Sequence, residues 1–224
     1  MKTEQDLIDA GRAAAAEGLR LWHLDVRDPS ARSLVQGDPE AMRWRTVIDE
    51  LHKSAGWGGS TPYPGDKVGE QWCGFFAAHC WRAAGLDPKW LASFFASTIR
   101  LQAWGQYAPW GTKANPPPAK GAPRRLVARL GRESKPADLP FTPREGDIVV
   151  VGDGSPAAGD HITIATGVDL ARGIIHTVEG NGSGNGPDGK SRHGIVVAER
   201  PIGGPGYCVR WIYRPAPSDL AEVI

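Results

Sequence analysis

Three side chains in this sequence could together carry out nucleophilic chemistry: Cys73, His161 and Glu179. A cysteine acts as a nucleophile when a histidine within hydrogen-bond reach takes its proton. The histidine in turn needs a third polar group that fixes its tautomer and its orientation. Whether the three side chains meet depends on the elements that carry them.

Cys73 stands at the expected start of a buried helix within residues 71–86, with Gly85 as its C-cap. Free backbone N–H groups and the helix dipole favour a thiolate at a helix start. A neighbouring imidazole lowers a cysteine pKa further. The alternative interpretation is that Cys73 is a small buried apolar residue, as free cysteines often are. The apolar residues at helical spacing are Phe75, Phe76, Ala78, Cys80, Ala83 and Ala84.

From residue 145 onward the pattern changes to strands joined by short turns, which predicts an antiparallel meander. His161 opens the second of these strands and Glu179 closes the third. Adjacent strands of a hairpin place the start of one beside the end of the other, so His161 and Glu179 should be neighbours. If the sheet packs on the helix, Cys73 joins them. The five expected strands are 147–151, 161–168, 173–179, 194–200 and 207–213.

Helices come first and the sheet follows, which predicts an α+β fold. We expect helices at 3–22, interrupted near Gly18, at about 42–51 and at 88–104. The glycine-rich residues 180–186 are interpreted as a loop. The expected organisation is an N-terminal helical extension (1–57), a catalytic domain (58–215) and a C-terminal tail (216–224).

A basic, proline-rich insertion at about 108–143 interrupts the expected catalytic domain. Within it, residues 124–132 could form a short helix, whereas the flanking prolines could not. One interpretation of the basic loop at 113–135 is a solvated surface excursion. The other is a flap that guides an anionic polymer or docks a partner.

Composition excludes several classes of protein. A net charge of +1 over 224 residues argues against a dedicated nucleic-acid binder. No apolar run reaches the ~20 residues of a membrane span, and the first residues do not form a signal peptide. Three cysteines without a signal argue against a disulfide framework and for synthesis in a reducing cytoplasm. We expect a monomer with no cofactor, and no ligand spacing indicates a metal site.

Four segments together resemble the CHAP family, the cysteine-, histidine-dependent amidohydrolases and peptidases. This family is related to the NlpC/P60 peptidoglycan hydrolases, and the resemblance implies a papain-like fold with the catalytic helix on a sheet of about five strands. It covers roughly residues 60–213. The segments are Trp72-Cys73-Gly74-Phe75-Phe76 and residues 143–149, 159–165 and 177–181.

The resemblance implies that Cys73 is the nucleophile, and that His161 is the general base and later the general acid. Glu179 would orient the imidazole, and Asn181 matches a polar position that can assist it. The backbone N–H of Cys73 would stabilise the oxyanion, with Gln71 and Trp72 at the substrate side. The implied reaction passes through an acyl-enzyme on the murein stem peptide, as an N-acetylmuramoyl-L-alanine amidase or a peptidoglycan endopeptidase.

Two other functions remain open: a catalytically silent wall- or partner-binding module of the same fold, and a cysteine amidase that acts on a non-wall peptide. A peptidoglycan hydrolase without a signal peptide would suit a phage endolysin, a tail-associated lysin or a toxin effector injected into a rival cell. Its site of action would be the periplasm or wall of the target bacterium. An effector would also have an immunity protein as partner.

Overall fold

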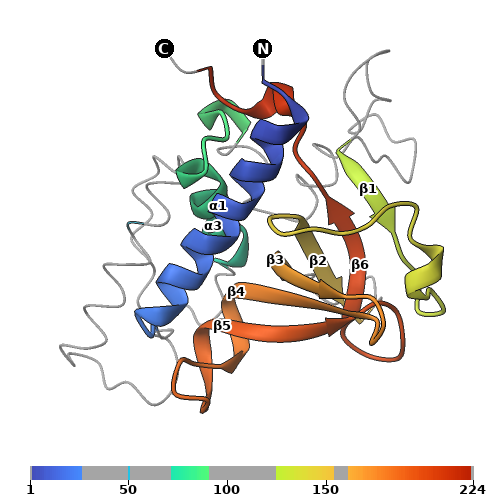
Figure 1. The fold of residues 1–224 in the computed structure, drawn as a ribbon. Coiled ribbons are helices and arrows are strands. Elements are labelled where there is room, and N and C mark those ends of the chain that lie inside the picture. Colours follow the sequence, from blue (N-terminus) through green and yellow to red (C-terminus); the bar gives the residue numbers. More distant parts are fainter. Residues whose placement is uncertain (1, 27–49, 51–71, 91–124, 154–160, 223–224) are drawn as a thin grey trace, which may run out of the picture.

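The computed structural model describes residues 2–26, 50, 72–90, 125–153 and 161–222. Within them the α-helices lie side by side against an antiparallel sheet, so the predicted α+β class is confirmed (Figure 1). The sheet has six strands, one more than expected. The helices are α1 (Glu4–His23) and α3 (Cys73–Ala83), and the strands are β1 (Leu126–Arg129), β2 (Ile148–Gly152), β3 (His161–Asp169), β4 (Ile174–Asn185), β5 (Ser191–Pro201) and β6 (Cys208–Tyr213).

The strand order is β1-β6-β2-β3-β4-β5, so only β2 to β5 form the expected meander. The prediction that the last strand continues the meander is wrong. β6 instead pairs with the other side of β2, from Ile148 opposite Tyr213 to Gly152 opposite Cys208. The connection at 202–207 makes this return possible, because Gly203, Gly204 and Gly206 all adopt positive φ angles that other residues rarely take.

The sixth strand, β1, lies within residues 124–132 of the insertion, which we considered able to form a short helix. Residues 126–129 pair with β6, and their side chains alternate in burial as those of a strand do. Leu126 and Ala128 are buried, whereas Arg129 is exposed. Propensity alone misled the prediction, because the pairing partner of β1 lies more than eighty residues later in the chain. Residues 108–124 of the insertion lie outside the described part.

Helix α1 is continuous, so the predicted interruption near Gly18 is wrong. Thr3 caps its start through a capping box with Asp6. Gly18 lies where the helix meets β4: a Cβ there would come within 2.5 Å of Cγ1 of Val178. The glycine therefore serves close helix–sheet contact. The lower helix propensity of glycine is offset by this packing.

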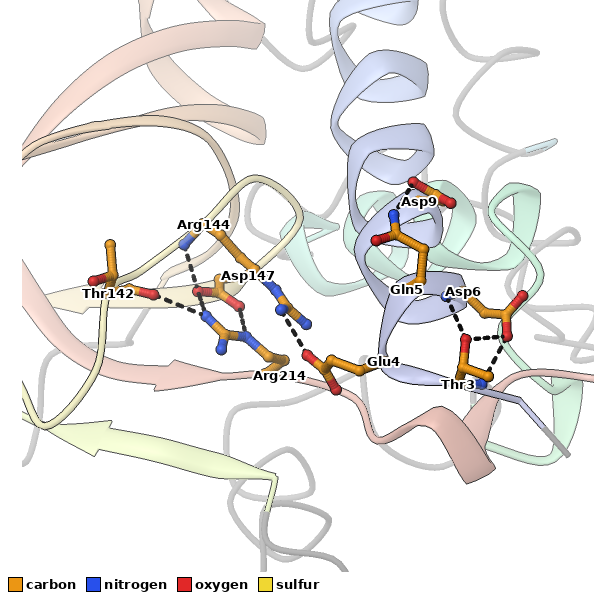
Figure 2. A network of polar contacts seen from close by, with 9 residues as sticks. All are labelled: Thr3, Glu4, Gln5, Asp6, Asp9, Thr142, Arg144, Asp147 and Arg214. Atoms are coloured by element: carbon orange, nitrogen blue, oxygen red, sulfur yellow. Dashed lines mark hydrogen bonds and ion pairs between the residues drawn. The ribbon is translucent and has the colours of Figure 1, made fainter.

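A polar network fastens the start of α1 to the segment before β2 (Figure 2). Arg144 Nη1 donates to Glu4 Oε1 at 2.7 Å. The Arg144 backbone N–H donates to the buried Asp147, which also receives two hydrogen bonds from Arg214 at 2.7 and 2.8 Å. Gly146 lies against Gly11 so closely that a Cβ on Gly146 would be 2.3 Å from the Gly11 Cα. This part of the 143–149 motif thus has a structural role.

Helix α3 begins at Cys73 and is followed by Gly85 with φ +92°, as the sequence predicts. Its apolar side joins α1 and the sheet in one hydrophobic core that contains Trp72, Phe76 and Trp81, each at most 1% exposed. The Trp81 indole N–H donates to the Gly146 carbonyl at 3.1 Å. These contacts hold α3 in a fixed position against the sheet.

The glycine-rich residues 180–186 form a strand over most of their length and not the expected loop. β4 runs on to Asn185 and pairs with β5, with Gly182 opposite Gly194 and Ser183 opposite His193. An irregularity between Glu179 and Gly182 interrupts the register, and Asn181 within it adopts φ +58°. Such a bulge changes the direction of the side chains next to it.

Both described ends of the chain pack on this core. α1 shares the core with α3, so the described part of the N-terminal extension packs on the sheet domain. Near the other end, Asp219 is fully buried and Leu220 forms a β-bridge with Leu86. The predicted helix at 42–51 lies outside the described residues except residue 50, and of the one at 88–104 only 88–90 is described, and is helical. None of the described helices is long and apolar enough to cross a membrane.

Candidate catalytic site

Cys73, His161 and Glu179 come together from three elements. Cys73 is the first residue of α3, His161 the first of β3, and Glu179 lies in β4 just before the bulge. The antiparallel register pairs Ile164 with Val178, which brings the start of β3 beside this part of β4. His161 Nε2 lies 3.1 Å from Glu179 Oε2, so the two side chains are the neighbours that the strand pattern predicted.

The Cys73 thiol lies against the imidazole of His161 and is only slightly exposed. Because Nε2 contacts the carboxylate, Nδ1 is the ring nitrogen left for the hydrogen bond with the thiol. The backbone N–H groups of Gly74 and Ile162 also point to the sulfur. Burial raises the pKa of the Cys73 thiol, but the hydrogen bond and charge of His161 and these N–H groups outweigh it, so the pKa lies below its ordinary value.

The pKa values of His161 and Glu179 are shifted in opposite directions. Burial lowers the pKa of His161, yet the contacts with Cys73 and Glu179 dominate and raise it to about 9. Burial raises the pKa of Glu179, whereas His161 and Arg200 together lower it to about 2. At neutral pH the arrangement therefore favours a thiolate, an imidazolium and a carboxylate in a row.

Two residues that the sequence reasoning missed complete the surroundings of Glu179. Arg200 of β5 donates from Nε to Oε1 at 2.6 Å and from Nη2 to Oε2, and the Thr177 hydroxyl donates to Oε1 at 2.6 Å. A signal was available in the sequence, because a carboxylate that is buried in a strand requires a cation nearby. Arg200, in the next expected strand, was the cation within reach.

The other predicted site residues are Asn181, Trp72 and Gln71. Asn181 is partly exposed at the bulge, and Glu179 is the residue that contacts the imidazole. Trp72 is the N-cap of α3 and fully buried, with its carbonyl accepting the Phe76 N–H. Its indole thus lies in the core. Gln71 lies outside the described residues.

Two other cysteines and two other histidines of the described part have surroundings of their own. Cys80 is fully buried two turns into α3, and burial raises its pKa well above the ordinary value. Cys208 is buried in β6. His79 contacts Glu17 at 3.1 Å, and His176 lies 3.8 Å from Glu199. Over the described residues, no group of three His, Cys, Asp or Glu side chains is placed to hold a metal ion.

The basic segment at 113–135 is described only from residue 125 onward. Arg125 is buried and forms a two-point ion pair with Asp219 at 2.7 and 2.5 Å. Arg132 donates to the Asp153 carbonyl at 2.7 Å. These two arginines thus have structural partners, and the flap interpretation does not apply to Arg125.

Comparisons of the chain with models of protein families, with curated proteins and with solved structures found no match.

Proposed function

We propose that this protein is a cysteine hydrolase that cleaves an amide bond through Cys73, His161 and Glu179. The observation that carries the proposal is the row of three side chains, with the imidazole hydrogen-bonded to the thiol on one side and 3.1 Å from the carboxylate on the other. This is the arrangement that an activated nucleophile, its base and an orienting group require. The position of Cys73 at a helix start adds a positive field that favours the thiolate.

Each residue then has a defined step. The Cys73 thiolate attacks the amide carbonyl carbon, and the first free N–H groups of α3, including that of Cys73, are suited to stabilise the oxyanion. His161 gives its Nδ1 proton to the departing amine, which leaves an acyl group on the sulfur. A water molecule, deprotonated by His161, attacks the thioester carbonyl; the acid product leaves, and the Cys73 thiolate and the His161 imidazolium are restored. Glu179 stays ionised throughout and holds the Nε2 proton of the ring.

For the substrate we propose the murein stem peptide or its bond to N-acetylmuramic acid, within a papain-like fold. Support comes from the resemblance of residues 72–76, 143–149, 159–165 and 177–181 to the CHAP family. The described residues of all four segments lie around the triad or in the packing of α1 beside it. The site of action that goes with this substrate is the wall or periplasm of a target bacterium.

Digestion of purified peptidoglycan, followed by mass spectrometry of the soluble fragments, tests the proposal. We expect fragments from the wild-type protein and none from Cys73→Ala, and their masses distinguish an amidase from an endopeptidase. Cys80→Ala is the matched control, because it removes a buried thiol of the same helix that has no contact with His161. Fragments released by Cys73→Ala would rule out the mechanism. No fragments from a folded wild-type protein would favour a non-wall amide or a silent binding module.

A further inference from the structure

Glu179 is fully buried, and each of its carboxylate oxygens receives two donors. Oε1 accepts from Arg200 Nε at 2.6 Å and from the Thr177 hydroxyl at 2.6 Å. Oε2 accepts from Arg200 Nη2 and faces His161 Nε2 at 3.1 Å. Two hydrogen bonds from one rigid guanidinium define the plane of a carboxylate, which a single ammonium group cannot do.

Arg200 reaches Glu179 from a position further along the neighbouring strand. Arg200 pairs in register with Ile175, four positions before Glu179 on the neighbouring strand. Its side chain therefore extends along the strands, past Thr177, to reach the carboxylate. The arginine side chain is 16% exposed, and its guanidinium carbon lies 5.5 Å from the ring centre of Tyr207. Arginine is well suited to such a partly buried position beside an aromatic ring.

Charge balance gives this contact a function. The groups that face Glu179 are His161 of β3 and Arg200 of β5, with Cys73 of α3 behind the imidazole and the Tyr207 phenol beside Arg200. With the thiolate formed, the buried row carries two negative and two positive charges. Without Arg200 it would carry a net negative charge in a dry environment, and Glu179 would compete for a proton.

We infer that Arg200 is a positioning residue, whose two-point contact holds Glu179 ionised and directed at the imidazole so that Cys73 remains a thiolate under acidic conditions. The inference rests on the cysteine-hydrolase mechanism proposed above. Arg200 acts through Glu179 and has no direct part in the chemistry.

The test is the rate at which iodoacetamide alkylates Cys73 from about pH 3 to about pH 8, followed by mass spectrometry. This rate follows the thiolate and needs no peptidoglycan. Loss of a nearby opposite charge raises a carboxylate pKa by roughly one to three units. For Arg200→Gln we therefore expect the acidic limb of the rate–pH profile to shift to higher pH by about one unit or more. At a pH on that limb, the alkylation of Cys73 would be about tenfold slower than in the wild type. Arg200→Lys, which keeps the charge, should shift the limb less.

Arg172→Gln is the matched control. Arg172 also makes a two-point contact with a glutamate, Glu199, but both side chains are about half exposed. Its profile should coincide with that of the wild type. In a Glu179→Gln background, Arg200→Gln should shift the profile no further, because the group through which it acts is gone. A further shift there would overturn the inference.

A loss of fold is measured separately, by circular dichroism, since global destabilisation lowers the amount of protein and does not displace the pH profile. If Arg200→Gln does not fold because Glu179 is left buried and unpaired, Arg200→Lys decides: an upward shift supports the inference, and a profile that coincides with the wild type overturns it. If wild-type Cys73 reacts no faster than free cysteine near pH 6, the proposed mechanism fails and the inference with it. If it reacts as a thiolate and neither Arg200 variant differs, only the inference fails.

Discussion

Replacing Gly180 with alanine should slow the alkylation of Cys73 by roughly 100-fold, although neither residue 180 nor its side chain takes part in the chemistry. Gly180 follows Glu179 and packs on the first turn of α3. A Cβ there would come within 2.5 Å of the Phe76 Cβ and 2.7 Å of the Trp72 indole. Both neighbours are fully buried and cannot swing away.

The expected magnitude follows from these distances. Ordinary contact begins near 3.4 Å, so β4 and α3 must separate by about 1 Å. That movement pulls Glu179 and His161 away from Cys73, and a thiol that returns to its ordinary pKa of about 8.5 is less than about 1% thiolate near pH 6, which makes alkylation roughly 100-fold slower. Overpacking also lowers the free energy of unfolding by about 1–3 kcal/mol. At ~2–4 °C per kcal/mol for a chain of this size, the melting temperature should fall by several degrees.

The assay is alkylation by iodoacetamide near pH 6 with mass spectrometry, which separates Cys73 from the fully buried Cys80 and Cys208. Thermal melting is followed in parallel. Gly131→Ala is the matched control, because its nearest neighbour would be the Ser134 hydroxyl at 3.9 Å. If Gly180→Ala matched Gly131→Ala in both alkylation rate and melting temperature, the close-packing argument would be refuted.

The remaining predictions concern stability. The pKa of Glu179 is about 2 in the folded protein and about 4.3 in the unfolded chain. Its ionised carboxylate therefore contributes fully to the free energy of unfolding above about pH 4.3, and this contribution is lost as the pH falls through about 2. Conversely, the pKa of His161 is about 9 in the folded protein and about 6.5 in the unfolded chain. Its contribution to the free energy of unfolding is therefore complete below about pH 6.5 and is lost as the pH rises through about 9. Urea unfolding should thus show the stability difference between the wild type and Glu179→Gln shrinking from about pH 5 to about pH 2; a constant difference would contradict this. Asp219→Asn leaves Arg125 buried without its counter-charge and should destabilise by about 3–5 kcal/mol in the same assay, against at most ~1 kcal/mol for the exposed Arg172→Gln; equal losses would contradict it.

Local patterns located the helix and most of the strands because their signals lie within a few residues. Apolar spacing and Gly85 placed α3, and alternation placed β3. The nearness of His161 and Glu179 also followed, since a hairpin joins their strands and its register is local. The catalytic role of these residues remains a prediction that the peptidoglycan digestion tests.

Glycines were the main source of error, because they have no side chain through which a sequence shows packing. Gly18 was interpreted as a helix break, but it lies within a continuous helix and allows close packing against Val178. Residues 180–186 were interpreted as a loop, but most of them extend strand β4. Gly182 and Gly184 there allow the β4 backbone to lie close to Val196. In each case the low local propensity is offset by a neighbour from another element.

The sequence by itself determined the α+β class, the start of α3 at Cys73 and the pairing of the strands that carry His161 and Glu179. The tertiary structure alone decided that β6 crosses to the far side of β2, that β1 pairs beyond it, and that Arg200 reaches Glu179. The physical reason is the range of the interactions. Helix ends and hairpins depend on residues close in the chain, whereas non-local pairing and a buried counter-charge depend on which distant surfaces the whole fold brings together.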